Sequence, residues 1–205
     1  GVGRHNRDAT ADRPLPGPGP HPERTLPPAV VEQALMVLRS QPVEVLTTTP
    51  PLLQALVVNP EAYDLLLAKV RGIVWTGTSM SDESHRLLSE ELLPAIPLVG
   101  WYGNTLMGIA CQRPPAEGDA YRCIFQPPAP WALVRLVDPT EPTREVGYGE
   151  RGRVKLSVLT EERFLPWMLE RDSAIRVAPR RVGLGDDVTQ VAPLDGAGPQ
   201  TEGVY

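Results

Sequence analysis

The feature that most constrains the fold is an alternation of helical and strand-like segments between residues 29 and 110. Apolar residues recur with a helical period in four segments and form short, β-branched runs in three others. The expected helices are 29–40, 50–57, 60–69 and 81–93, and the expected strands are 43–46, 72–75 and 97–100. Pro50 and Pro60, each preceded by a capping residue, mark two of the helix starts. This order predicts an α/β layer built on a parallel sheet.

Polar or small residues follow all three expected strands, at residues 47–49, 76–79 and 102–105. Because the carboxyl ends of parallel strands meet at one edge, and ligands bind at that edge, we expect these segments to converge on one rim. The most distinctive segment is 101–107, Trp-Tyr-Gly-Asn-Thr-Leu-Met. Its aromatic, glycine and hydroxyl groups suit a strand-to-loop corner that faces a nucleotide. The alternative is an ordinary hydrophobic turn with a buried tyrosine.

Beyond residue 120 the pattern changes to antiparallel strands with one solvated face, expected at 121–125, 131–138 and 153–159, with one further strand at 188–191. The chain contains 24 prolines and 18 glycines, which cluster near both ends and around residues 114–130. We therefore divide it into four parts. They are a Pro/Gly-rich arm (1–26), an α/β nucleotide-binding layer (27–113), a smaller antiparallel β subdomain (114–177) and a loop-rich tail (178–205).

Composition excludes several classes of function. The net charge of −5, with scattered basic residues, argues against a nucleic-acid partner, and no apolar run has the length of a membrane span. Two cysteines, Cys111 and Cys123, give neither a disulfide framework nor a metal-ligand spacing, so we expect no metal site of that kind and a cytoplasmic location. We expect Cys111 and the four tryptophans to pack in the core, and His85 to be a solvated surface residue.

Three segments, taken in order, resemble the AMP-forming adenylating enzymes, the acyl-CoA synthetase and adenylation-domain superfamily. They are residues 72–79, residues 101–108, and residues 148–154 with 165–172. The chain is similar to the C-terminal half of the large domain in that superfamily. Within it, the sequence most resembles the phenylacetate-CoA ligase-like branch and the phenazine antibiotic biosynthesis proteins of actinomycetes.

The resemblance implies roles for individual residues. The loop of Thr76, Gly77 and Thr78 would lie beside the adenine of ATP or AMP. Tyr102 would stack on the adenine, with Gly103 next to it. Thr105 would meet the α-phosphate as the catalytic residue, and Asp172 would hold both ribose hydroxyls, since a carboxylate can accept two hydrogen bonds from a diol. Residues 170–172 could equally form an exposed charged turn.

The same resemblance implies a ligase of antibiotic or secondary metabolism that converts an aryl or acyl carboxylic acid into its adenylate. The family usually places a Mg²⁺-binding Glu directly after the Thr, where this chain has Leu106. Neither the phosphate-loop lysine nor the lid lysine of the family is matched, because Lys69 and Lys155 are the only lysines. We therefore expect slow turnover from the isolated chain.

The alternative is a catalytically inactive nucleotide-binding or scaffold subunit, or a partial domain. A complementary chain or a second copy is expected to contact the edge at residues 43–46.

Overall fold

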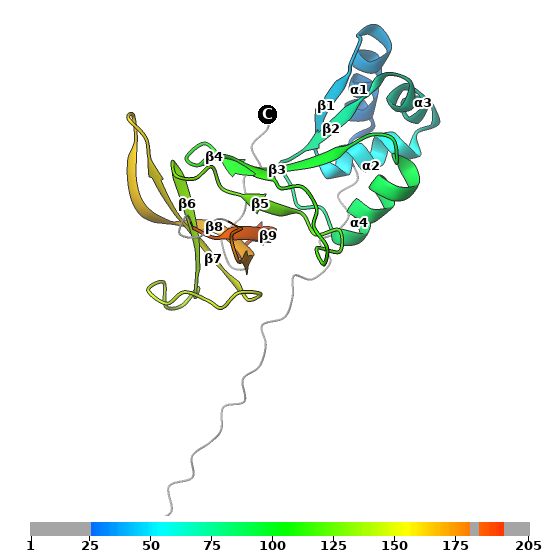
Figure 1. Ribbon diagram of the computed structural model, residues 1–205. Helices are drawn as coiled ribbons and strands as arrows, with labels where there is room; N and C mark the ends of the chain where they lie inside the picture. The colour runs from blue at the N-terminus through cyan, green and yellow to red at the C-terminus, as the bar shows by residue number, and fades with distance from the viewer. Residues whose placement is uncertain (1–25, 181–184, 195–205) are drawn as a thin grey trace, which may run out of the picture.

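The computed structural model describes residues 26–180 and 185–194, which form a mixed α/β structure around one curved sheet (Figure 1). The helices are α1 (Pro28–Ser40), α2 (Pro50–Val58), α3 (Pro60–Lys69) and α4 (Asp82–Arg86), which continues into the π-helical turn η1 (Leu87–Leu92). The strands are β1 (Val45–Thr48), β2 (Gly72–Trp75), β3 (Leu98–Asn104), β4 (Gly108–Gln112), β5 (Ile124–Gln126), β6 (Ala132–Val137), β7 (Arg151–Leu159), β8 (Phe164–Val177) and β9 (Asp187–Pro193). The arm at 1–26, apart from Leu26, lies outside the described residues, as does most of the tail beyond β9.

The sheet has nine strands in the order β1-β2-β3-β4-β5-β9-β8-β7-β6. The pairs β1–β2 and β2–β3 are parallel, and every later pair is antiparallel. The expected fold class, a parallel α/β layer followed by antiparallel strands, is confirmed. Strand β9 is the last strand of the described residues, and it lies between β5 and β8, so it joins β3–β5 to β6–β8 in one sheet.

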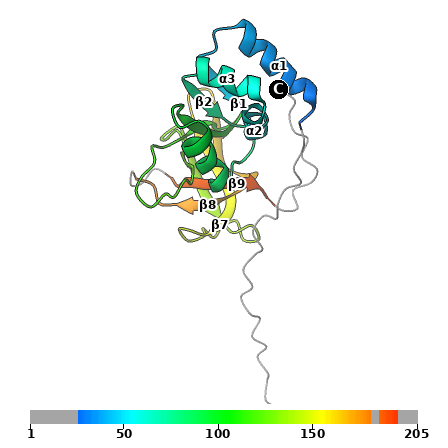
Figure 2. The same cartoon turned by 90° about the vertical axis from the view of Figure 1, so that its right-hand side faces the viewer.

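Capping residues start the helices of the α/β layer as the sequence predicts. The Asn59 side chain accepts a hydrogen bond from the Ala62 amide at 3.0 Å, and the Ser81 hydroxyl accepts one from the Ser84 amide at 3.1 Å. Thr49 occupies the N-cap of α2 but makes no side-chain capping bond. Helices α1, α2 and α3 and the turn η1 pack their apolar residues into one cluster with Leu46, Ile73 and Leu98 of the sheet. The helices therefore cover one face of the parallel strands, the side turned toward the viewer in Figure 2.

The parallel and antiparallel parts of the sheet meet at Gly100 on β3. Strand β3 pairs with β2 as far as Trp75↔Gly100 and pairs with β4 from Trp101↔Cys111 onward. A Cβ atom on Gly100 would lie 2.6 Å from the Trp75 ring and 2.9 Å from the Phe125 ring, so no other residue fits without displacing them. The Gly100 amide donates to the Gln112 side chain at 2.7 Å, which satisfies the backbone where the pairing changes.

The antiparallel part differs from the sequence prediction in two strands. Strand β5 begins at Ile124 because Ala120 and Tyr121 have positive φ angles of 47° and 65°, which place the start of the expected strand in a turn. Strand β8 was not expected, since Trp167, with a φ of 43°, and two register shifts against β7 break the alternation that marks a strand. Strand β7 pairs regularly with β6, and along β7 buried and half-buried residues alternate as predicted.

Three expectations about burial are wrong. Trp131 and Trp167 are exposed, whereas Trp75 is buried in the core as expected. Cys111 is exposed, because it lies on the face of β4 opposite Ala110, which is buried in the core. His85 is buried, and burial lowers its pKa. In the described parts of the chain, no helix has the length and apolar character needed to cross a membrane.

Because Gly100 has no room for a methyl group, we expect Gly100→Ala to lower the free energy of unfolding by about 1–3 kcal/mol, the usual cost of overpacking. Gly72→Ala is the matched control, since a Cβ on Gly72 would meet nothing within 4 Å. Urea unfolding followed by circular dichroism measures both variants. Equal stability of Gly100→Ala and the wild type would contradict a tight junction at this position.

Candidate functional site

The segment at 101–107 does not form the strand-to-loop corner that the sequence predicts. Strand β3 continues to Asn104, so Tyr102 and Gly103 lie within a strand, and only residues from Thr105 onward belong to the turn into β4. The Asn104 side chain accepts hydrogen bonds from the amides of Leu106 and Met107 at 2.9 and 2.8 Å and so shapes this turn. Antiparallel pairing with β4 extends β3, because Trp101↔Cys111 through Asn104↔Gly108 form a regular ladder.

Tyr102 and Asp172, which are 70 residues apart in sequence, are in contact. The Tyr102 hydroxyl donates a hydrogen bond to Asp172 Oδ2 at 3.2 Å. Strands β3 and β8 are separated in the sheet order by β4, β5 and β9. A hydrogen bond between side chains of these two strands therefore requires the sheet to curl, so that β3 and β8 face each other.

A second pair of residues lies beside the first. Asn104 follows Tyr102 by two residues on β3, and Glu170 precedes Asp172 by two on β8, so each pair shares one face of its strand. The Asn104 side chain hydrogen-bonds Glu170, while Glu170 Oε1 is buried without a hydrogen-bond partner in the described parts of the chain. Sequence reasoning did not propose Asn104 or Glu170 for the site. The alternation of a strand could have suggested Glu170 if β8 had been recognised.

Burial dominates the electrostatics of this group of four residues. Burial raises the pKa of Asp172, against the hydrogen bond from Tyr102 and the charge of Arg171. Burial and the neighbouring Asp172 charge raise the pKa of Glu170. The pKa of Tyr102 is raised by burial first and by Asp172 second, so its hydroxyl keeps its proton and acts as a donor. Two carboxylates, a phenol and an amide thus form a polar group in a partly dry environment.

The aromatic ring of Tyr102 is already in contact with the core. Its centroid lies 6.0 Å from that of Phe125 at an interplanar angle of 57°, and Phe125 in turn lies 5.9 Å from Trp75. This row of rings connects the end of β2 with the polar group. The loop at Thr76, Gly77 and Thr78 follows directly after Trp75, and the positive φ of Gly77, 88°, turns the chain next to Thr49.

Gly103 has a structural role that the sequence did not indicate. A Cβ on Gly103 would lie 2.0 Å from the Gly108 carbonyl oxygen on the paired strand. The close approach of two backbones in the β3–β4 hairpin is therefore sufficient to require glycine at this position, whether or not a ligand also lies there.

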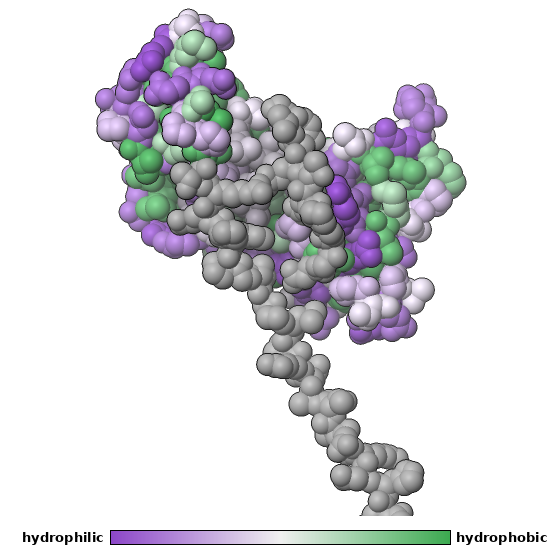
Figure 3. Space-filling view, turned by 180° about the vertical axis from the view of Figure 1, so that it is seen from behind, coloured by the Kyte–Doolittle hydropathy of each residue, from purple (hydrophilic) through white to green (hydrophobic). Residues whose placement is uncertain are grey.

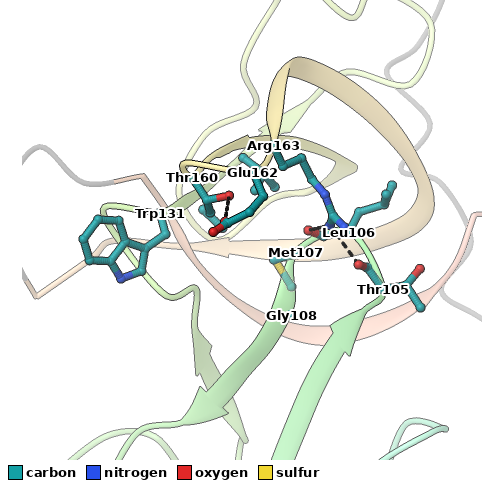
Figure 4. A pocket seen from close by; sticks show the side chains of 10 residues that line it. Thr105, Leu106, Met107, Gly108, Trp131, Thr160, Glu162 and Arg163 are labelled. Atoms are coloured by element: carbon teal, nitrogen blue, oxygen red, sulfur yellow. Dashed lines mark hydrogen bonds between the residues drawn. The ribbon is translucent and has the colours of Figure 1, made fainter.

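Thr105 lies at a separate hollow, with a volume of about 310 Å³, between the β3–β4 turn and the β7–β8 hairpin (Figure 4). Arg163 fixes the turn by donating to the carbonyl oxygens of Thr105 and Leu106 at 2.9 and 2.8 Å. Trp131, Thr160 and Glu162 line the same hollow, whereas Tyr102 and Asp172 do not. The structure thus brings Tyr102 and Asp172 together and places Thr105 at a hollow that these two residues do not line.

No family model matches the chain, and no curated protein matches it. Solved structures match it by fold. The crystal structure of IdnL1 matches with a TM-score of 0.53 at 17% identity, over 80% of this chain and 38% of that one. The anthranilate CoA ligase AuaEII, in complex with anthranoyl-AMP, matches with a TM-score of 0.56 at 16% identity, over 78% of this chain and 32% of that one. A benzoate CoA ligase from Burkholderia xenovorans LB400 gives 0.54 at 17% identity, over 78% and 33%.

The fold is that of the AMP-forming adenylating enzymes. The chain spans 32–38% of the length of these three structures, so it corresponds to one part of the adenylating fold. This agrees with the sequence resemblance to half of the large domain.

A nucleoside needs hydrogen-bond acceptors for its ribose hydroxyls, whereas a metal ion needs several ligating side chains in one place. Asp172 keeps a second carboxylate oxygen for a diol, and the Tyr102 ring adjoins it. The side chain of Leu106 packs against the core, so it offers no ligand where the family resemblance places the Mg²⁺-binding Glu. Within the described ranges, no three His, Cys, Asp or Glu residues lie close enough to hold a metal ion.

Because the folded pKa of Asp172 is raised, the folded protein binds this proton at a higher pH than the unfolded chain does. The stability that Asp172 contributes is therefore present at low pH and is lost as the pH rises through its folded pKa. We expect Asp172→Asn, which does not titrate, to be more stable than the wild type at pH 7, and this advantage to shrink as the pH falls toward about 4. Urea unfolding at several pH values measures it, with the exposed Asp64→Asn as control. A pH-independent difference would contradict the assignment.

Proposed function

We propose that this chain is the adenosine-binding part of an ATP-dependent ligase that activates a carboxylic acid as its adenylate. The observation that carries the proposal is the contact between Tyr102 and Asp172, the two residues that the family resemblance places on the adenine and the ribose. One nucleoside can reach both side chains. Asp172 would accept hydrogen bonds from the ribose hydroxyls, and the loop of Thr76, Gly77 and Thr78 would lie on the adenine side.

In the proposed reaction, a carboxylate oxygen of the acid attacks the α-phosphorus of ATP. The bond to the bridging oxygen breaks, which releases pyrophosphate and leaves the acyl- or aryl-adenylate. Such a transfer depends on positioning and on neutralisation of phosphate charge. Thr105 is the candidate residue for a contact with the α-phosphate. Leu106 has no atom that could ligate Mg²⁺, so other groups would have to hold that ion.

The proposed substrate class and pathway rest on the sequence resemblance and on the solved structures that share this fold. Two of the matched structures are an anthranilate and a benzoate CoA ligase, which supports an aryl acid as substrate. The resemblance to the phenylacetate-CoA ligase-like branch supports a role in antibiotic biosynthesis of the phenazine type. The two free cysteines agree with a cytoplasmic location.

A second candidate function is that of a catalytically inactive nucleotide-binding or scaffold subunit. The observation that favours it is the packing of Leu106, which replaces a charged group by an apolar one that contacts the core. Losing one preorganised electrostatic contact typically costs about 10²–10³ in rate. Pyrophosphate exchange with a panel of aryl and fatty acids separates the two candidates. Robust exchange by the chain alone would exclude the inactive subunit.

AMP binding tests the site directly. We expect Asp172→Ala to weaken AMP binding by about 1.5–3 kcal/mol, the scale of a hydrogen bond to a charged group. Tyr102→Phe keeps the ring and should bind AMP nearly as the wild type does, whereas Tyr102→Ala should lose affinity. Isothermal titration calorimetry measures the affinities, with Asp64→Ala as the control for removing an exposed carboxylate. Unchanged affinity in Asp172→Ala would remove this residue from the site.

A further inference from the structure

Side chains from a distant part of the chain hold the turn between β3 and β4. Residues 105–107 form this turn, and the pair Asn104↔Gly108 closes it, with a positive φ of 79° at Gly108. Three-residue hairpin loops commonly end with a residue of this conformation. Leu106 packs against the core and Met107 is buried, whereas Thr105 is exposed. The turn therefore keeps Thr105 in contact with solvent, next to two apolar anchors.

Asn104 shapes the turn from the β3 side. Its Oδ1 atom accepts hydrogen bonds from the amides of Leu106 and Met107 at 2.9 and 2.8 Å. The side chain also hydrogen-bonds Glu170 on β8, and Nδ2 is the only atom of an asparagine side chain that can donate to a carboxylate. All of these contacts form together in one orientation of the amide group. Glu170 therefore selects the orientation in which the oxygen faces the turn.

Arg163 holds the turn from the opposite hairpin. It directly precedes β8, and its Nη1 atom donates to the carbonyl oxygens of Thr105 and Leu106 at 2.9 and 2.8 Å. Figure 4 shows this side chain reaching the turn across the edge of the hollow. In the space-filling view the end of the β7–β8 hairpin is hydrophilic and projects beyond a more hydrophobic region (Figure 3). The two hydrogen bonds of Arg163 connect this projecting end to the turn.

The two sets of hydrogen bonds act on the same two peptide groups. The peptide group between Thr105 and Leu106 donates its N–H to Asn104 and accepts from Arg163 with its carbonyl oxygen. The peptide group between Leu106 and Met107 does the same. Because a peptide group is planar, hydrogen bonds at both of its ends determine its orientation. The first of these groups adjoins the Cα atom of Thr105, so its orientation constrains the direction of the Thr105 side chain.

We propose that Arg163 and Glu170 are positioning residues that hold the Thr105 hydroxyl where it meets the α-phosphate of the nucleotide. This rests on the proposed function, in which Thr105 makes that contact. Glu170 acts through Asn104, and Arg163 acts through main-chain carbonyl groups, so neither residue touches the phosphate. Strand β8 also carries Asp172, the candidate for the ribose. One strand and the residue before it thus set both the ribose contact and the phosphate contact.

Conservative variants separate positioning from a direct contact with the ligand. Glu170→Gln keeps an oxygen that accepts from Asn104, and Glu170→Ala removes it. Arg163→Lys keeps a donor for the two carbonyl oxygens, and Arg163→Ala removes it. A Glu170 that ligated a cation would lose its role in Glu170→Gln, and an Arg163 that gripped the phosphate with both arms of its guanidinium group would lose its role in Arg163→Lys.

Calorimetric titration with AMP and with adenosine tests the proposal. We expect Arg163→Ala and Glu170→Ala to bind AMP about five- to tenfold more weakly and adenosine within about twofold of the wild type, because only AMP carries the phosphate. Arg163→Lys and Glu170→Gln should bind both nearly as the wild type does. Arg122→Ala is the matched control, since Arg122 also donates to two carbonyl oxygens of a turn, those of Asp119 and Gly118 at 2.9 and 2.8 Å. Equal losses for AMP and adenosine, or no loss for either, overturn the proposal.

Amide hydrogen exchange measured by NMR tests the same turn without a nucleotide. We expect the amides of Leu106 and Met107 to exchange about three- to tenfold faster in Glu170→Ala than in the wild type, the effect of weakening one hydrogen bond. Asn104→Ala, which removes the acceptor itself, sets the upper limit of this effect. Glu170→Gln should exchange as the wild type does. Unchanged exchange in Glu170→Ala overturns the proposal even if AMP binds.

The exchange measurement also separates this proposal from the proposed function. Glu150→Ala is its control, because the Glu150 carboxylate accepts from the Gly147 amide at 2.7 Å in another turn, and its loss should leave the β3–β4 turn unchanged. A wild-type chain that binds neither AMP nor adenosine would overturn the proposed function and the phosphate contact of Thr105 together. Faster exchange in Glu170→Ala would still show that Glu170 positions the turn.

Discussion

The contact of Gly100 with Trp75 and Phe125 is the constraint on which the rest of this structure depends. At this glycine β3 exchanges a parallel partner for an antiparallel one, so a single strand belongs to both parts of the sheet. The two rings meet over the missing side chain, at 5.9 Å between centroids, and join the cores of the two parts. A larger residue would separate the rings and change the direction in which β3 leaves the α/β layer. That direction decides whether Tyr102 can reach β8.

Beyond Gly100 the sheet curls and brings polar groups together, and the burial of these groups opposes folding. Tyr102 and Asn104 from β3 face Asp172 and Glu170 from β8, and burial raises the pKa of both carboxyl groups. A partly buried carboxylate with an unpartnered oxygen opposes folding unless something pairs with it. Such groups are concentrated at functional sites. Other buried polar atoms of the described residues also lack a hydrogen-bond partner, among them both carboxylate oxygens of Asp186, although Asp186 forms an ion pair with Arg176 at 3.0 Å.

Helices cover one face of the parallel strands, and no described element covers the other face. The matched adenylating structures are much longer than this chain, which spans about a third of their length. Strands β2 and β3 are apolar along nearly their whole length, which is typical of parallel strands that are buried on both faces. Because Trp101 and Tyr102 point to opposite faces of β3, the face without helices and the candidate nucleotide site are separate surfaces of one strand.

The sequence by itself determined the α/β layer, since helical periodicity, Asn59-Pro60 and Ser81 specify helices through local interactions. It also determined the regular strands β6 and β7, whose alternation follows from one buried face. Only the tertiary structure decided the rest. Strand β8 has no regular alternation of apolar and polar residues, because bulges break its register, so the sequence pattern did not predict it. The burial of His85 and the exposure of Trp131 depend on which elements pack over them. The meeting of Tyr102 with Asp172 was expected from the family resemblance alone. Its physical cause is the curl of the sheet, which brings together strands that are not neighbours, and no local sequence pattern encodes a contact across 70 residues.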